Sequence, residues 1–340
     1  MTSASSPTVD VVGAAPAAGR WGGYSTYAWA VLGLTLMVIL WGAFVRATGS
    51  GAGCGSHWPL CNGEVVPRAP ALATMIEFGH RLSSGLILLC IGALVVGAWR
   101  RYPAGHLVRF AAVLSGMFIV SEALIGAGLV LLEHVAGDTS IARGYWVGGH
   151  LLNTFLLVAA LTLTAWWASG GRPLSLRAHP RLAVLLGSAL CAVLVLGISG
   201  AVTALGDTLF PVATLAEGKA LTFSSTAHVF VRLRVWHPAL AVVVGLWLGV
   251  ASLAAARARP LPAVRRLGLT LAGLYGLQLA LGVLNVWLLA PVGVQLAHLL
   301  LSDLIWIAAV LLTASALGES PATGVRAPAA AGAIPSPMEF

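Results

Sequence analysis

Long apolar stretches separated by short polar loops dominate the chain. Eight of them hold about 20 or more mostly apolar residues, the length that an α-helix needs to cross the hydrocarbon core of a bilayer. The pattern therefore predicts an all-α integral membrane protein with eight transmembrane helices. The predicted spans are residues 27–46, 75–99, 109–132, 146–168, 181–205, 228–256, 264–290 and 292–316.

Composition supports a bilayer protein, because 59% of the 340 residues are hydrophobic and only 9% are charged, against about 25% charged in soluble domains. The first span has no charge from Tyr27 to Phe44. It is too long for the core of a signal peptide, so we expect a retained helix. The ends, residues 1–23 and 318–340, are rich in Ala, Pro, Ser and Gly, and we expect them to be disordered cytoplasmic tails.

The positions of the basic residues predict the orientation. If both termini are cytoplasmic, twelve of the nineteen Lys and Arg residues fall on the inner side of the membrane. This positive-inside bias predicts a multi-pass protein of the cell membrane with both ends in the cytoplasm. The arginines are scattered over short loops rather than gathered on one face, which argues against nucleic-acid binding. Membrane lipid is the expected surrounding, and a homo-oligomer remains open.

The predicted helices also match each other four against four. Four helices per half means that both halves enter the membrane from the same side, as in a parallel repeat. We therefore expect two pseudo-twofold-related four-helix bundles, residues 24–170 and 171–317. The matches are Gly42 and Thr48 with Gly197 and Thr203; Glu122, Ile125, Gly126 and Val130 with Gln278, Leu281, Gly282 and Val286; His80 with His237; and His150 with His298.

Four histidines lie at equivalent repeat positions, one in the outer half of each even-numbered span: His80, His150, His237 and His298. A single histidine in a span can be a packing residue, but ionisable residues within membranes are costly and usually functional. Two neutral imidazoles at one depth within a bundle suit axial ligation of a haem iron. Zinc fits less well, because it normally takes three or four ligands drawn together. The pattern predicts two haem sites near the outer surface.

The loop between the first two spans reads "RATGSGAGCGSHWPLCNGEVVP" and contains Cys54 and Cys61. The predicted orientation places it on the oxidising face, where a disulfide can persist. An exposed bridge there could be redox-active, and a structural staple is an equal alternative. Cys90 and Cys191 lie inside spans, where we expect inert packing.

Glu77 lies three residues before His80, on the same helical face. Beside a haem, its carboxylate could act as a base or stabilise developing positive charge; the alternative is an interfacial salt bridge with Arg81 or Arg46. The matching residue of the second half is Arg234, so we expect chemistry in the first half only. The candidate contacts for haem propionates, which suit bidentate guanidinium groups, are Arg46, Arg81, Arg232 and Arg234.

Five motifs of the membrane region, about residues 27–316, closely resemble the haem A synthase family. They are "RATGSGAGCGSHWPLCNG", "EFGHR", "GGHLLNT", "WHP" and "AHLLLSDLIW". The resemblance implies eight helices in two bundles, a resident haem b, and oxidation of the C8 methyl group of the substrate haem O to the formyl group of haem A by successive hydroxylations. It also implies haem O synthase as the upstream partner and cytochrome oxidase as the user of the product; the electron partner stays open.

By resemblance, Glu77 is the catalytic acid. His80 and His150 would hold the substrate haem, and His237 and His298 the haem b. Cys54 and Cys61 match the disulfide pair of the first outer loop. Two departures are the absence of a second cysteine pair between the fifth and sixth spans, and His237-Pro238 where some relatives have His-Arg.

Two other classes of protein are alternatives to an enzyme. A di-haem bis-histidine cytochrome b that only transfers electrons would have no need of Glu77. A transporter is disfavoured, because no helix is visibly broken by Gly or Pro near mid-membrane in both halves.

Overall fold

The structure is a computed structural model that describes residues 22–319, so most of both predicted tails lies outside the described residues. Eight helices are long and apolar enough to cross a membrane, which confirms the all-α membrane fold. Within the described residues no β-strand forms. The long helices are α1 (Gly22–Ala47), α2 (Leu72–Arg101), α3 (Leu107–Leu131), α4 (Ile141–Ala168), α5 (Pro180–Leu209), α8 (Trp236–Ala258), α9 (Pro262–Trp287) and α10 (Val292–Leu317).

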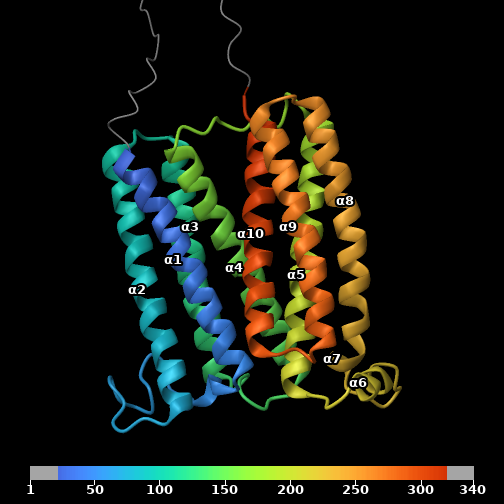
Figure 1. The fold of residues 1–340 in the computed structure, drawn as a ribbon. Coiled ribbons are helices and arrows are strands. Elements are labelled where there is room, and N and C mark those ends of the chain that lie inside the picture. The colour runs from blue at the N-terminus through green and yellow to red at the C-terminus, as the bar shows by residue number, and fades with distance from the viewer. Residues whose placement is uncertain (1–21, 320–340) are drawn as a thin grey trace, which may run out of the picture.

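The helices form two neighbouring groups, α1–α4 and α5 with α8–α10 (Figure 1). Helices α4 and α10 lie at the centre: α4 packs against α5, and α10 packs against both α1 and α4. They are also the most buried spans. The pseudo-twofold relation between the two groups stays a prediction.

Phe155 of α4 and Trp306 of α10 join the two groups at the centre. Their rings stack with centroids 5.4 Å apart, and Trp306 Nε1 donates a hydrogen bond to the Phe155 carbonyl at 2.7 Å. Phe155 is 1% and Trp306 3% exposed. The pair therefore fills the seam between the groups and pairs the indole N–H, which lipid could not.

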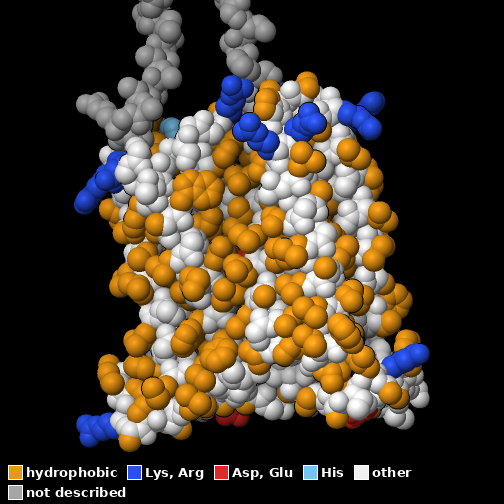
Figure 2. Space-filling view, in the orientation of Figure 1, with side chains coloured by type: hydrophobic (Ala, Val, Ile, Leu, Met, Phe, Trp, Pro, Cys, Tyr) orange, Lys and Arg blue, Asp and Glu red, His pale blue; other side chains and the backbone are white. Residues whose placement is uncertain are grey.

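Both ends of the described chain lie at one end of the molecule, and the α1–α2 loop lies at the other (Figure 1). Figure 2 shows an apolar belt around the middle and several Lys and Arg side chains at the end where the termini lie. The termini thus share one side of the predicted membrane. That this side is the cytoplasm stays a prediction from the positive-inside bias.

Local signals account for several helix boundaries. Ser140 caps α4 by accepting a hydrogen bond from the Arg143 amide, and a proline begins α5 and α9, where the missing N–H costs nothing. Helix α9 ends at Trp287 instead of the predicted residue 290. Leu289 and Ala290 have positive φ, and the Ala290 amide donates to the Asn285 carbonyl, which turns the chain as a Schellman motif does.

Other boundaries differ from the sequence prediction. Helix α1 begins at Gly22, so two residues of the predicted tail are helical, and the sixth span is divided into α7 (Val229–Arg232), the 3₁₀ turn η2 (Leu233–Val235) and α8. A second 3₁₀ turn, η1, covers Ser50–Ala52. Helix α6 (Leu215–Thr222) lies in the long outer loop and was not expected. Thr214 accepts from the Glu217 amide, and Glu217 accepts from the Ala213 amide, so a capping-box pattern marked this helix in the sequence.

Replacing Phe155 with Ala should destabilise the protein by about 3–5 kcal/mol, because it leaves a cavity at the central seam. The measurement is the free energy of unfolding in mixed micelles, titrated with a denaturing detergent. Phe110→Ala is the matched control, since Phe110 is 59% exposed on α3 and its loss should cost within about 0.5 kcal/mol. Equal effects of the two substitutions would contradict a central role of this pair.

Candidate functional site

The four predicted histidines lie in the half of the molecule that carries the α1–α2 loop, one each on α2, α4, α8 and α10. Each imidazole packs against a glycine of another helix. A Cβ added to that glycine would approach the Cε1 atom of the ring: 2.9 Å for Gly42 and His80, 4.0 Å for Gly126 and His150, 2.9 Å for Gly200 and His237, and 3.3 Å for Gly282 and His298. Glycine, which has no side chain, therefore leaves room for the ring. This room is needed most at Gly42 and Gly200 and least at Gly126, where an added Cβ would make an ordinary contact.

The glycine contacts also test the register of the sequence repeat. They support the match of Gly126 with Gly282, since each lies on the histidine of the following span. The match of Gly42 with Gly197 was wrong by three residues. An added Cβ at Gly197 would meet the Phe155 ring at 2.7 Å, whereas the glycine on the imidazole of His237 is Gly200. Periodicity alone cannot separate two glycines that lie on neighbouring positions of one helical face.

His237 and His298 face each other with ring centroids 6.4 Å apart. Two metal–imidazole bonds of about 2 Å, with about 1 Å from each ring centre to its nitrogen, require roughly 6 Å between ring centres. The spacing therefore fits one iron between the two rings. Ser199 Oγ lies 2.9 Å from His237 Nδ1 and gives its own hydrogen to the Leu196 carbonyl. Nδ1 therefore carries the ring proton and leaves the Nε2 lone pair for a metal.

The first pair has a different environment. Glu122 of α3 lies behind His150, with Oε1 3.3 Å from His150 Nδ1. Its carboxylate also accepts hydrogen bonds from the Asn153 amide at 2.6 Å and from the Thr154 hydroxyl. The carboxylate of Glu122 therefore lies beside His150 of the first pair. The sequence had indicated Glu122 only through its repeat match with Gln278.

Glu77 is 3% exposed and is bound to the α1–α2 loop. Its Oε2 accepts a hydrogen bond from the Cys54 amide at 2.8 Å, and its Oε1 lies 2.5 Å from Arg81 Nη2. Arg81 also donates to the carbonyls of His57 and Leu60. The expected salt bridge with Arg81 is present, and it is buried rather than interfacial. The Glu77 carboxylate and the loop therefore fix each other's position.

Cys54 and Cys61 form a disulfide. The half-cystines are 0% and 1% exposed, so the exposed, labile bridge considered from the sequence is not what the structure contains. Gly53 lies directly against the backbone of Ala73, where an added Cβ would approach the carbonyl at 2.5 Å, and its own carbonyl accepts from the Thr74 hydroxyl. This close packing favours the structural staple.

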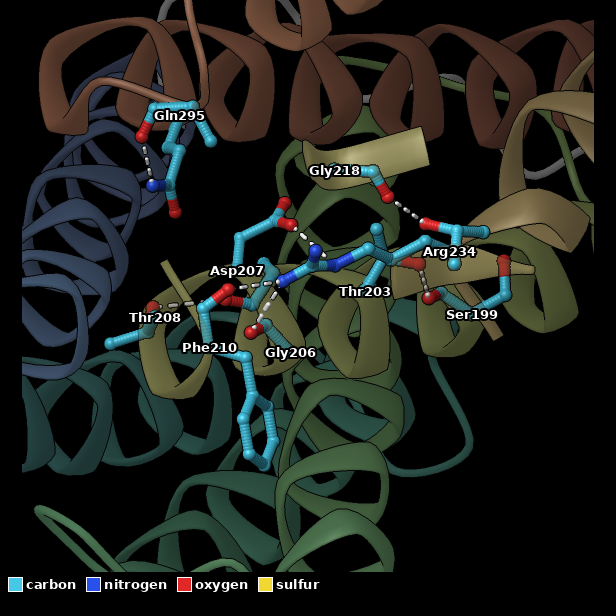
Figure 3. A network of polar contacts seen from close by, with 12 residues as sticks. Ser199, Thr203, Gly206, Asp207, Thr208, Phe210, Gly218, Arg234 and Gln295 are labelled. Carbon is cyan, nitrogen blue, oxygen red and sulfur yellow. Dashed lines mark hydrogen bonds and ion pairs between the residues drawn. The ribbon is translucent and has the colours of Figure 1, made fainter. Parts of the chain in front are cut away.

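Three of the four candidate arginines donate to protein groups in the described chain. Figure 3 shows Arg234 between Asp207 and the carbonyls of Gly206 and Phe210. Arg46 of α1 donates to the Ala204 carbonyl and the Thr208 hydroxyl of α5, and to Gln295 of α10, and Arg81 binds Glu77 and the loop. Arg232 is exposed at the end of α7. The propionate roles of these four residues stay predictions.

Sequence reasoning missed two acidic residues, the half-buried Asp207 and the buried Asp303. Asp207 pairs with Arg234 Nε at 2.8 Å, but the predicted fifth span ended before it. Asp303 of α10 is 0% exposed, and neither carboxyl oxygen makes a hydrogen bond to the described residues. A lone acid in an apolar run was the available signal for Asp303. Residues 22–319 contain no group of three or more His, Cys, Asp or Glu placed to hold a metal ion.

A family model described as "Cytochrome oxidase assembly protein", COX15-CtaA, matches residues 25–310. The chain is 52% identical to protoheme IX farnesyltransferase of Thermus thermophilus over 297 residues, 87% of this chain and 49% of that protein. It is 44% identical to haem A synthase of Shouchella clausii over 131 residues, 38% and 42% of the two chains. It is 41% identical to haem A synthase of Bacillus mycoides over 109 residues, 32% and 35% of the two chains.

The match to the Thermus relative and the match to the family model cover different shares of length. The chain spans about half the length of the Thermus relative. The family model, in contrast, matches most of this chain and includes all four histidines and Glu77.

Glu77→Ala should accelerate reduction of the Cys54–Cys61 disulfide by dithiothreitol about tenfold, because it removes two charge-assisted contacts of the loop, worth roughly 1.5–3 kcal/mol each. Trapping the released thiols with a maleimide and counting them by mass gives the rate. Glu64→Ala is the matched control: Glu64 contacts Arg68 in the same loop, but this ion pair is exposed and worth about 0–1 kcal/mol. Equal rates in wild type and Glu77→Ala would show that Glu77 does not stabilise the loop.

Proposed function

Because the chain belongs to the COX15-CtaA family of cytochrome oxidase assembly proteins, we propose that it is a haem A synthase. In this proposal it is a membrane oxidoreductase that oxidises the C8 methyl group of haem O to a formyl group by successive hydroxylations. The observation that carries the proposal is the contrast between the halves: each has two histidines, and the buried carboxylate of Glu77, one turn before His80, has the cation Arg234 at the matching position of the second half.

The two histidine pairs have separate roles in this proposal. His80 and His150 hold the substrate haem in the first bundle, and His237 and His298 hold haem b in the second. The 6.4 Å separation of the His237 and His298 rings supports axial ligation there. Haem b, when bound, supplies a one-electron iron couple beside the reacting pocket.

Glu77 orients and stabilises the reacting part of the substrate. Its carboxylate is fixed by the Cys54 amide and by Arg81, so no reorganisation is needed when positive charge develops at the methyl carbon. The same oxygens can accept a proton from that carbon or from the hydroxyl group formed there. The disulfide loop packs over Glu77 and limits the access of water, which strengthens these electrostatic effects.

Among the candidate propionate contacts, Arg232 is the strongest. Its side chain is exposed near the start of α8, whereas Arg46, Arg81 and Arg234 already donate to protein groups. A propionate contact of those three would have to share their donors with the protein. We therefore propose Arg232 as the first contact of a haem b propionate.

The upstream partner in this proposal is a haem O synthase. The Thermus relative carries the name of a protoheme IX farnesyltransferase and is about twice as long as the matched region. We propose that this name refers to the part of the relative outside the match, so that two consecutive activities are joined in one chain there. The product would then serve cytochrome oxidase, in keeping with the family description.

Glu77→Ala should retain both bound haems and accumulate haem O or a partly oxidised haem. The measurement is chromatography and mass spectrometry of haems extracted from membranes of a host that supplies haem O. Glu133→Ala is the control, because Glu133 lies in the α3–α4 loop at the same end of the bundle. This variant should give haem A as the wild type does. An unchanged yield of haem A from Glu77→Ala would favour the di-haem electron-transfer cytochrome instead.

A further inference from the structure

We propose that Glu122 is the positioning residue of His150, and that this carboxylate makes the iron site of the first bundle chemically different from that of the second. The inference rests on the proposed function, because it assumes that His150 is an axial ligand. It goes further by assigning a role to a residue of α3. This residue is neither a proposed iron ligand nor the proposed catalytic acid, and it belongs to none of the five sequence motifs.

The contacts of Glu122 direct its carboxylate toward the imidazole. Oε2 accepts from the Asn153 side-chain amide at 2.6 Å, and Oε1 accepts from the Thr154 hydroxyl. Oε1 also lies 3.3 Å from Nδ1 of His150, within ion-pair range but without the direction of a hydrogen bond. Asn153 and Thr154 follow His150 on the same helix, so one short segment of α4 supplies both the proposed ligand and the two donors that fix its partner.

A further shell fixes Asn153. Its side-chain amide also donates to the Phe118 carbonyl at 2.9 Å, and its side-chain oxygen accepts from the Ser121 hydroxyl at 2.6 Å. These hydrogen bonds to α3 therefore hold the side-chain amide of Asn153 in a single orientation. This arrangement matches that of metal-binding histidines, whose second ring nitrogen usually donates to a carboxylate or carbonyl group.

The second bundle lacks this arrangement at the same repeat positions. Gln278 takes the place of Glu122, and the match of Gly126 with Gly282 one turn later supports this register. Leu301 takes the place of Asn153. His150 Nδ1 and His298 Nδ1 are both buried without a hydrogen bond to the described residues, and so is the Gln278 side-chain oxygen. Of the two histidines, His150 is the one with a carboxylate oxygen within ion-pair range. A carboxylate therefore supports His150, whereas no such group supports His298.

The difference has a chemical consequence. A carboxylate that accepts the Nδ1 proton fixes the tautomer with Nε2 free and makes the imidazole a stronger electron donor. A stronger donor favours the oxidised over the reduced iron, so the reduction potential of the first site is lower than it would be with a neutral partner. Glu122 thereby adjusts the iron of the reacting pocket separately from the iron of the second bundle.

The test uses the full-length protein, purified in detergent and titrated with haem. Glu122→Gln keeps the size of the side chain and removes its charge. We expect about 10- to 100-fold weaker haem binding at the first site, together with a positive shift of its midpoint potential. Haem at the second site of the same molecule should keep its affinity and potential, which reports that the variant is folded. The converse variant, Gln278→Glu, should shift the potential of the second site in the negative direction.

His150→Ala and His298→Ala assign each spectral component to its site. If the wild type binds no haem, or if neither alanine variant loses a component, the proposed function fails before the role of Glu122 is reached. If the assignment succeeds and Glu122→Gln retains wild-type affinity and potential at the first site, the proposal is overturned. Equal loss of haem from both sites in Glu122→Gln would also overturn it, because Glu122 would then serve folding.

Discussion

Lipid offers no hydrogen bonds, and this constraint governs where polar side chains lie in the structure. Tyr24 of α1 donates to the Leu94 carbonyl of α2, and Tyr275 of α9 donates to the Ala241 carbonyl of α8. Trp306 pairs with the Phe155 carbonyl in the same way. Against this background the imidazoles stand out, because the Nδ1 atoms of His80, His150 and His298 are buried and make no hydrogen bond to the described residues. Polar atoms retained at this cost are typical of binding sites.

The two halves share an arrangement of histidines against glycines and differ in their acidic residues. Both place an imidazole against a glycine of the preceding long helix, so each ring lies between closely spaced backbones. Only the first half adds Glu77 and Glu122. The counterpart of Glu77 is Arg234, which pairs with Asp207, and the counterpart of Glu122 is Gln278. If the predicted repeat holds, substitution at these few positions would account for the proposed division between a reacting site and an electron-carrying site.

The sequence predicted the eight spans because about 20 apolar residues are enough to specify each one. It also predicted the four histidines as a set, since repeat position carries more information than any single residue. It could not place Glu122 against His150, or the Cys54 amide against Glu77, because both contacts join different segments through side-chain geometry. The register error at Gly197 has a related cause: helical periodicity identifies a face but does not show which glycine on it meets the ring. Helix α6 was recognisable from its capping box and was overlooked.

Arg46 belongs to the first half but donates only to groups of the second: the Ala204 carbonyl, the Thr208 hydroxyl and Gln295. Separating the halves at this end would leave a guanidinium without partners in a medium of low dielectric constant, at a cost of several kcal/mol. Rocking motions of the kind that carry solutes across membranes need such a separation. The hydrogen bonds of Arg46 oppose such a separation, so in the proposed function an electron passing between the two histidine pairs would tunnel through the same stretch of protein each time.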